Sequence, residues 1–375
     1  MKIKLNTATF QNMVAKAVKG VGGNNNLFIT QLMAIRLQEN TLTLITTNGE
    51  QYLYINEPKI AGDDFYVVVP ADKFSKLISK QTCEDITLEI PSAKKGQLDT
   101  LVVRGNGKYT IELPYDEDGE LIEFPDPLAE VIDGDDSGWS KGEVNLSTIR
   151  LLLQTAKAAL MLGTEAPWYT GYYAGERVVT TDTYKICGVD VEIFEDPKLI
   201  PAELMDLLDV MSEEKINIDY NDETLIFSTG KETVYGNVLE GIDEWQIDAI
   251  NSILDEKYAS SCKIEKALLL QMLERIGLFV DVFDKNSVYL TFTKDGLEVA
   301  SKKGSGSEVI PYRESENFKD FTCCLDIELF KSQVKANQSD VVEILYGKDT
   351  NIKIVQGNTK QIIALADDDR FSEDE

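Results

Sequence analysis

The sequence predicts an α+β protein built from three tandem copies of one domain, each with two helices on antiparallel sheets. A strand–helix–strand pattern supports this prediction by recurring at residues 65–90, 197–220 and 321–346. A strand–turn–strand segment that turns at glycine follows each copy, and a further helix precedes each one. Because such internal repeats define the architecture of a chain, the fold class follows from the repeat rather than from any single element.

The repeated unit is as large as a whole domain. The central helix of the three copies begins at Pro70, Pro201 and Asp326, which are residue types suited to a helix start. The first two of these residues are 131 positions apart, and the last two are 125 positions apart. We therefore predict three domains, which comprise residues 1–127, 128–245 and 246–375.

The predicted boundaries fall in segments of distinct composition. Residues 115–142 are acidic and rich in glycine and proline, as linkers are, and a weaker junction lies near 241–258. The last residues, DDDRFSEDE, form an acidic tail that we interpret as a solubilising end.

The six expected helices differ in charge from the rest of the chain. They hold eleven basic and eight acidic residues, so they carry +3 while the other 297 residues carry −31. Most of the basic residues recur at i,i+3, i,i+4 or i,i+7 and so project from one helical face. Two helices depart from this pattern. Helix 201–212 holds three acidic residues and no basic residue. In helix 264–276, Lys266 and Arg275 lie about half a turn out of phase. The helix windows are residues 7–20, 71–81, 147–160, 201–212, 264–276 and 325–338.

Composition excludes several classes of function. The chain of 375 residues has 37 basic and 65 acidic residues, a net charge of −28, and no histidine. Catalytic triads with histidine, histidine general bases and His-containing zinc sites are therefore excluded. The sequence also lacks phosphate-loop, nucleophile-elbow and calcium-loop motifs, so we expect no enzyme, no cofactor and no metal.

The cysteines and the start of the chain indicate a cytoplasmic protein. The N-terminus lacks the apolar core of a signal peptide, and no stretch approaches the ~20 apolar residues of a membrane span. The cysteines show no framework spacing, so we expect reduced, buried thiols. They are Cys83, Cys187, Cys262, Cys323 and Cys324.

Three further motifs occur in order along the chain: VVPADKFSKLI at 68–78, EFPDP at 123–127 and TTDTYKICGVDVEI at 180–193. Together they resemble the bacterial DNA polymerase III β subunit, the β sliding clamp, over essentially the whole length of the chain. In the third motif, Thr181 and Asp182 match the family's T-D-G-H-R-L segment. The residues Thr183, Tyr184, Lys185 and Ile186 replace its Gly, His, Arg and Leu.

This resemblance implies the DNA clamp fold, with two three-domain subunits joined head to tail as a homodimer in a six-domain ring. Such a ring encircles double-stranded DNA without reading its sequence and serves as a processivity factor in DNA replication. The acidic exterior would keep DNA off the outside of the ring. The residues that the resemblance places toward DNA are Lys16, Lys19, Lys73, Lys76, Lys80, Arg150, Lys157, Lys266, Lys331 and Lys335.

The resemblance also implies a groove between domains 2 and 3 that binds short peptide motifs of the DNA polymerase and the clamp loader. The segment IDEWQ replaces the family's Phe-Pro-[Asp/Asn]-Tyr, and the chain continues beyond the final strand with an acidic tail. These departures favour a different peptide motif and would suit a phage-encoded clamp acting in the cytoplasm of its bacterial host. The groove positions are Thr170, Thr181, Thr183, Tyr184, Lys185, Ile186, Ala249, Ile362, Ala364, Leu365 and Ala366.

For the dimer interface, the resemblance implies that an edge strand of domain 1 with Tyr109 and Ile111 meets the first helix of domain 3 near Leu278. Strand alternation puts Tyr109 and Ile111 on one face. A role in the ordinary core of domain 1 explains these two residues equally well.

Two other classes of function are weighed against a clamp. An acidic DNA mimic or anti-restriction protein would account for the net charge of −28, but it gains nothing from lysine-rich helices. A hydrolase with paired carboxylates would need a carboxyl group in a cleft with a strongly raised pKa.

Overall fold

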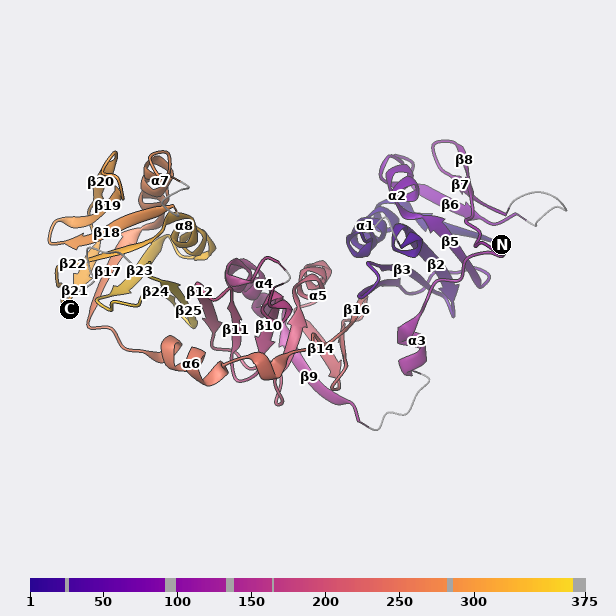
Figure 1. The fold of residues 1–375 in the computed structure, drawn as a ribbon. Helices are drawn as coiled ribbons and strands as arrows, with labels where there is room; N and C mark the ends of the chain where they lie inside the picture. Colours follow the sequence, from indigo (N-terminus) through magenta and orange to yellow (C-terminus); the bar gives the residue numbers. More distant parts are fainter. Residues whose placement is uncertain (24–26, 92–98, 133–137, 164, 282–285, 367–375) are drawn as a thin grey trace. The chain divides into compact units, whose positions relative to one another are not determined.

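The structure, a computed structural model, describes residues 1–23, 27–91, 99–132, 138–163, 165–281 and 286–366 (Figure 1). The chain divides into two compact units: unit 1 comprises Met1–Ile149 and Glu203–Val238, and unit 2 comprises Arg150–Ala202 and Leu239–Glu375. Both units draw on the middle domain of the sequence-based division, and that division stays a prediction. The acidic tail at 367–375 lies outside the described residues.

Unit 1 contains an eight-stranded sheet in the order β5-β2-β3-β4-β16-β15-β14-β9 and a four-stranded sheet in the order β1-β6-β7-β8. Its strands are β1 (Lys2–Asn6), β2 (Leu32–Gln38), β3 (Thr41–Thr47), β4 (Tyr52–Glu57), β5 (Phe65–Pro70), β6 (Asp85–Glu89), β7 (Thr100–Arg104), β8 (Lys108–Glu112), β9 (Ser140–Asn145), β14 (Lys215–Tyr220), β15 (Thr224–Ser228) and β16 (Glu232–Asn237). Its helices are α1 (Thr7–Ala17), η1 (Val18–Gly20), η2 (Phe28–Gln31), α2 (Ala71–Ser79), α3 (Pro127–Ile132), η5 (Leu208–Val210), most of α5 (Ala202–Leu207) and the start of α4 (Leu146–Thr155).

Unit 2 contains a nine-stranded sheet in the order β13-β10-β11-β12-β25-β24-β23-β17-β21 and a four-stranded sheet in the order β20-β19-β18-β22. Its strands are β10 (Gly171–Ala174), β11 (Val178–Thr181), β12 (Lys185–Val189), β13 (Lys198–Pro201), β17 (Ser260–Glu265), β18 (Ser287–Thr293), β19 (Gly296–Ser301), β20 (Ser307–Ile310), β21 (Glu314–Glu316), β22 (Phe321–Asp326), β23 (Val341–Tyr346), β24 (Asn351–Gln356) and β25 (Thr359–Ala364). Its helices, besides the end of α4, are η3 (Ala156–Ala159), η4 (Pro167–Thr170), η6 (Ile242–Glu244), α6 (Ile247–Asp255), α7 (Lys266–Gly277) and α8 (Ile327–Ala336).

The two larger sheets repeat one strand order. In unit 1, β5-β2-β3-β4 are followed by β16-β15-β14-β9, and in unit 2, β13-β10-β11-β12 are followed by β25-β24-β23-β17. Strands in the same position also hold the same place relative to the helices along the chain. The predicted α+β repeat is therefore confirmed, as β5-α2-β6, β13-α5-β14 and β22-α8-β23, each with its hairpin.

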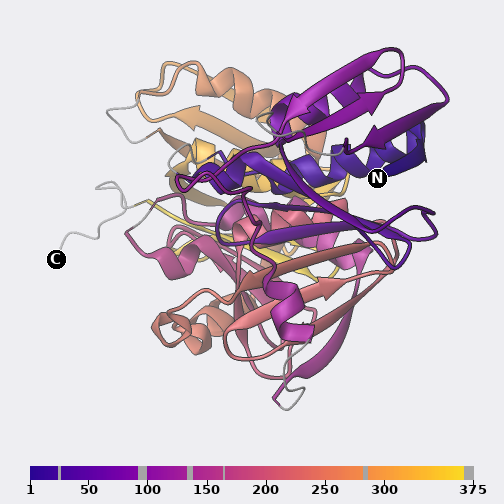
Figure 2. The same cartoon turned by 90° about the vertical axis from the view of Figure 1, so that its right-hand side faces the viewer.

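Pairs of helices cover the sheets through aromatic and aliphatic side chains. In unit 1, α1 and α2 pack through Phe10 and Phe74, whose rings meet edge to face at 6.0 Å. Figure 2 shows α1, in indigo, beside the purple strands of the four-stranded sheet. In unit 2, Met272 of α7 and Phe330 of α8 enter one buried cluster, in which Phe292 stacks on Tyr346 at 3.9 Å. The helices thus bury one face and leave their polar face outward.

Local details agree with most of the sequence-based expectations. The carboxylate of Asp326 caps α8 by accepting hydrogen bonds from the backbone N–H groups of Glu328 and Leu329, as predicted. All five cysteines are free thiols, and all except the half-buried Cys83 are buried. Burial raises the pKa of the Cys187 and Cys262 thiols to about 12, so both stay protonated and unreactive at neutral pH.

Two helices lie where the sequence predicts only linkers. Helix α3 falls within 115–142 and α6 within 241–258. The proline and the acidic neighbours of α3 suggested a linker. However, proline can begin a helix, as Pro127 does, and Leu128 packs against a buried cluster of unit 1. Helix α6 has apolar residues at helical spacing that bury Ile250 and Leu254.

Candidate functional site

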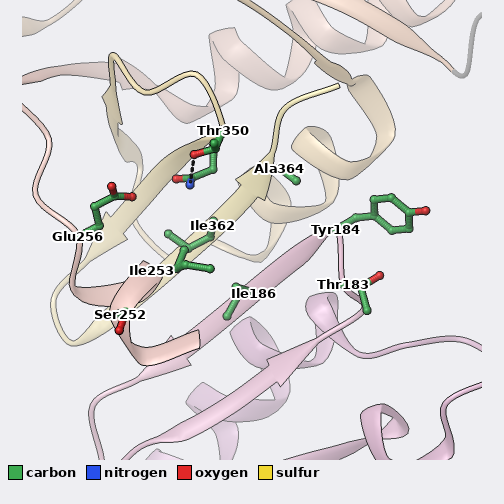
Figure 3. A pocket seen from close by; sticks show the side chains of 10 residues that line it. Thr183, Tyr184, Ile186, Ser252, Ile253, Glu256, Thr350, Ile362 and Ala364 are labelled. Atoms are coloured by element: carbon green, nitrogen blue, oxygen red, sulfur yellow. Dashed lines mark hydrogen bonds between the residues drawn. The ribbon is translucent and has the colours of Figure 1, made fainter. Parts of the chain in front are cut away.

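A groove of about 490 Å³ lies on unit 2 where β12 pairs with β25. Its floor is apolar: Ile186 of β12 and Ile362 of β25 are direct cross-strand neighbours. Ile253 of α6 forms a wall, and Figure 3 shows these three side chains pointing toward one another. The rim is polar. It includes the hydroxyl of Ser252 on α6, the hydroxyl of Thr350 before β24 and the amide of Asn351 at the start of β24. The lining residues are Thr183, Tyr184, Ile186, Ser252, Ile253, Glu256, Thr350, Asn351, Ile362 and Ala364.

Five of the eleven sequence-derived groove positions line this groove: Thr183, Tyr184, Ile186, Ile362 and Ala364. Tyr184 stands at the edge with 65% of its surface exposed, and its backbone carbonyl accepts a hydrogen bond from the N–H of Ala364 at 2.9 Å. The other half of the lining was missed, namely Ser252, Ile253, Glu256, Thr350 and Asn351. The isoleucine spacing in α6 was the available signal for its part of the wall.

The remaining groove positions do not line the cavity. Thr170 lies in η4, where its hydroxyl donates to the carbonyl of Pro167, and Ala249 is exposed on α6. Leu365 and Ala366 follow β25, and their backbone N–H groups donate to the carbonyls of Thr350 and Cys324. Thr181 and Lys185 are buried, and their hydrogen bonds shape the loop between β11 and β12.

This loop is built on two side chains. The hydroxyl of Thr181 donates to the carbonyl of Lys185 at 2.7 Å and accepts the N–H of Thr183. The carboxylate of Asp182 accepts the N–H groups of Tyr184 and Lys185. Thr183 adopts a φ of +74°, a conformation that glycine favours and that costs energy for a residue with a side chain. The hydrogen bonds hold Thr183 and Tyr184 at the rim.

The side chain of Lys185 turns away from the groove into a buried polar network. Its ammonium lies 3.2 Å from the carboxylate of Asp182 and donates to the carbonyl of Ala158 at 2.8 Å. The same carbonyl accepts from the amide of Gln333 in α8, and Gln361 of β25 donates to the side-chain oxygen of Gln333. Lys185 therefore supports the loop rather than contacting anything in the groove.

The predicted DNA-facing residues fall into two groups. Four side chains are engaged within the protein: Lys16 with Glu232, Lys76 with Asp72, Lys331 with Glu328, and Lys266 with the carbonyls of Lys335 and Asn337. The other six are exposed on or beside their helices, as Lys76 also is, and Lys157 among them has a further interaction within the protein. They are Lys19, Lys73, Lys80, Arg150, Lys157 and Lys335.

Among the predicted DNA-facing lysines, Lys16 has the most deeply buried carboxylate partner. Its partner Glu232 is 1% exposed and also accepts hydrogen bonds from Ser212 and Thr229 at 2.7 Å. Burial raises the pKa of Glu232, but the hydrogen bonds from Lys16, Thr229 and Ser212 outweigh it and hold the pKa below its usual value. The pair ties α1 to β16 inside unit 1.

The predicted interface residues also differ in how much of each side chain is exposed. Leu278, just after α7, is 82% exposed, and Tyr109 on β8 is partly exposed. Ile111 is only 1% exposed because it faces the interior of unit 1, so its side chain offers no surface to a partner. Phe279, which follows Leu278, and Val309 on β20 are also exposed.

Other classes of site find little support in the residues that the structure describes. No group of three or more Cys, Asp or Glu side chains there could hold a metal ion, and no described helix is long and apolar enough to cross a membrane. Burial raises the pKa of the Asp326 carboxyl, but its oxygen caps α8 and is not free for acid–base chemistry.

The repeated sheets with paired helices are the architecture of the DNA clamp fold. Solved structures with this fold match nearly the whole chain. The β subunit of Streptococcus pyogenes DNA polymerase aligns with a TM-score of 0.83 at 14% identity, covering 98% of this chain and 100% of that one. The DNA polymerase sliding clamp of Bacillus subtilis aligns with a TM-score of 0.80 at 14% identity, covering 98% and 99%.

A third solved structure, a Pseudomonas aeruginosa sliding clamp bound to griselimycin, aligns with a TM-score of 0.78 at 13% identity, covering 98% and 99% of the two chains. No protein-family model and no curated protein matches the sequence. The fold implied by the sequence motifs is thus confirmed over 98% of the chain.

Proposed function

We propose that the protein is a DNA sliding clamp without enzymatic activity. Two protomers join head to tail in a ring around double-stranded DNA, and a groove on each tethers a DNA polymerase, a clamp loader and other replication proteins through short peptides. The groove is the surface defined above by its lining residues. The likeness to solved sliding clamps supports this proposal, and the strand order of the four-stranded sheets carries it.

The four-stranded sheets are the two unmatched halves of the repeat. In unit 2, β22-β18-β19-β20 correspond to β5-β2-β3-β4, since α7 precedes β18 as α1 precedes β2, and α8 follows β22 as α2 follows β5. In unit 1, β8-β7-β6-β1 correspond in the same way to β16-β15-β14-β9. Pairing β20 of one protomer with β8 of its partner would therefore create a third eight-stranded array.

An association of this kind is heterologous, because it uses two different edges, and two copies satisfy both edges by closing a ring. Exposed strand edges favour such pairing unless they are covered. The apolar side chains of Tyr109, Leu278, Phe279 and Val309 lie at or beside these edges and would gain burial on pairing.

The basic helices supply the second argument. Six exposed basic side chains lie on or beside helices in a chain of net charge −28, and in the proposed ring they would face the phosphates of the encircled duplex. A DNA mimic is disfavoured, because it would present carboxylates in place of these cations.

Topological retention tests the proposal directly. The protein is loaded on nicked circular DNA with a clamp loader at about 0.2 M salt, and then the DNA is linearised. A ring stays on the circle and slides off the linear form. Equal retention on both forms, or loss from both, would contradict the proposal.

Oligomeric mass tests the proposed edges. The wild-type protein should show about twice the 41.9 kDa of one chain by light scattering. Leu278→Asp should give the mass of a single chain, because it puts a charge in an apolar interface. Leu162→Asp is the matched control, since Leu162 is also exposed in unit 2 but away from β20, and it should stay dimeric.

A further inference from the structure

One strand beside the groove carries a buried lysine. In β24, Ile352 and Ile354 enter the core of unit 2, and Lys353 between them points to the opposite face. Only 3% of Lys353 is exposed. An ammonium group at this depth is costly unless it is hydrogen-bonded, and no carboxylate pairs with it among the described residues.

The ammonium of Lys353 binds the end of helix α6. It donates to the carbonyls of Leu254 at 2.8 Å and Glu256 at 2.6 Å, and lies 4.8 Å from the ring centre of Tyr258. The last carbonyls of a helix have no partner within the helix, and they form the negative end of its dipole. The aromatic face adds a cation–π contact. Lys353 is thus a side-chain cap for α6.

The capped end of α6 is the wall of the groove. Ser252, Ile253 and Glu256 line the groove from this last turn and the residue that follows it. On the sheet, Lys353 is the direct cross-strand neighbour of Ile362, which forms the floor. One side chain therefore joins the wall to the floor.

The repeat itself does not need a lysine at this place. In unit 1 the corresponding cross-strand pair is Ile226 and Tyr235, and Ile226 is buried. In unit 2 the same position holds Lys353 opposite Ile362, and burial lowers the pKa of Lys353. The sheet folds with an aliphatic residue here, so the lysine has a local purpose in unit 2.

We propose that Lys353 is a positioning residue of the groove, whose ammonium fixes the last turn of α6 so that Ile253 and Ser252 are held in place for a bound peptide. The inference rests on the proposed function of the groove. A wall that is already ordered spares the peptide the entropic cost of ordering it.

The test uses a defined probe and the full-length protein. The probe is a fluorescent nonapeptide selected from a random library on the wild-type protein and rejected by Ile362→Trp, which fills the groove. Lys353→Met should weaken binding of this peptide about tenfold, equivalent to about 1.4 kcal/mol. Its melting temperature should fall only slightly, because the loss of hydrogen bonds to two carbonyls is partly offset by removing a costly buried charge.

Two further variants complete the test. Lys353→Arg keeps the donors and should restore much of the affinity. Lys348→Met removes a lysine that, within the described residues, binds the side chain of Glu256 rather than a backbone carbonyl of α6, and it should change affinity less than twofold. Hydrogen exchange should show faster exchange of the α6 amides in Lys353→Met and not in Lys348→Met.

The outcomes separate this inference from the proposed function. Affinity of Lys353→Met within twofold of wild type would overturn the positioning role. A large fall in its melting temperature together with lost binding would also overturn it, because Lys353 would then serve the whole fold. If no library peptide binds the groove of the wild-type protein, the proposed tethering function fails instead.

Discussion

Two strand pairings at the same position of the repeat have opposite characters. Seam 1 is the pairing of β4 with β16 in unit 1, and seam 2 is the pairing of β12 with β25 in unit 2. One pair of cross-strand neighbours occupies the same position in both seams. In seam 1 this pair is Tyr52 and Tyr235, whose rings meet edge to face at 6.0 Å. Seam 2 holds Ile186 and Ile362, which form the floor of the groove. Larger side chains fill this position in seam 1, and smaller ones line a groove at the same position in seam 2.

The loops beside the two seams are nearly the same. In seam 1 the hydroxyl of Thr47 donates to the carbonyl of Gln51 and accepts the N–H of Gly49, as Thr181 does with Lys185 and Thr183 in seam 2. Gly49 has a φ of +108°. The backbone scaffold is therefore common to both, and the side chains decide which seam has a groove at this position.

The seams are also secured differently. Glu232 in seam 1 is buried and ion-paired with Lys16, whereas the corresponding residue of seam 2 is Thr359. The hydroxyl of Thr359 is buried and has no hydrogen-bond partner among the described residues. At this position seam 1 has a buried carboxylate paired with Lys16, and seam 2 has a buried hydroxyl instead.

The largest expected effect comes from breaking this charge pair. Glu232→Ala should lower the free energy of unfolding by about 3 kcal/mol, because it leaves the Lys16 ammonium without its partner. Thr359→Val in seam 2 should change it by about 0.5 kcal/mol or less. Urea denaturation measures both, and similar losses at the two positions would contradict the difference between the seams.

Filling seam 2 should nearly abolish peptide binding. Ile186→Trp should weaken binding of the library peptide by about a hundredfold, because the indole occupies the floor of the groove. Tyr52→Trp at the corresponding place in seam 1 should leave the affinity within twofold. Fluorescence anisotropy measures the binding, and thermal unfolding checks that both variants fold.

The pH dependence of stability should follow Glu232. Its pKa in the folded protein is below the ordinary 4.5, so its contribution is fully present above about pH 4.5 and is lost as the pH falls through the lowered pKa. The difference in unfolding free energy between wild type and Glu232→Gln should therefore be constant from pH 7 to 5 and should shrink below pH 4.5. A difference that persists unchanged at pH 3 would show that the charge is not involved.

The smallest effect concerns the tyrosine pair. A double-mutant cycle of Tyr52→Ala and Tyr235→Ala should give a coupling free energy of about 1 kcal/mol, the range of edge-to-face aromatic pairs. The same cycle at Ile186 and Ile362 should give a smaller coupling, because an aliphatic pair lacks the edge-to-face ring contact. Equal couplings would mean that the seams are packed alike.

The sequence by itself determined the repeat, because periodic apolar residues, helix starts at Pro70 and Asp326, and glycine turns are local signals. It also indicated Ile186 and Ile362 as groove residues through the resemblance of their motifs. It did not determine α3 and α6, because acidic and glycine- or proline-containing surroundings indicated linkers there, and the packing of Leu128, Ile250 and Leu254 is decided by the fold.

Only the tertiary structure decided which charges are free and which are used. Lys16, Lys185, Lys266 and Lys353 look like solvent-exposed lysines in the sequence, yet each is bound to a carboxylate or to a carbonyl of a distant segment. The partners lie tens to hundreds of residues away, so no local pattern encodes them. Whether a charged side chain stays exposed or is paired depends on which groups the fold brings within about 3 Å of it, and packing decides which groups those are.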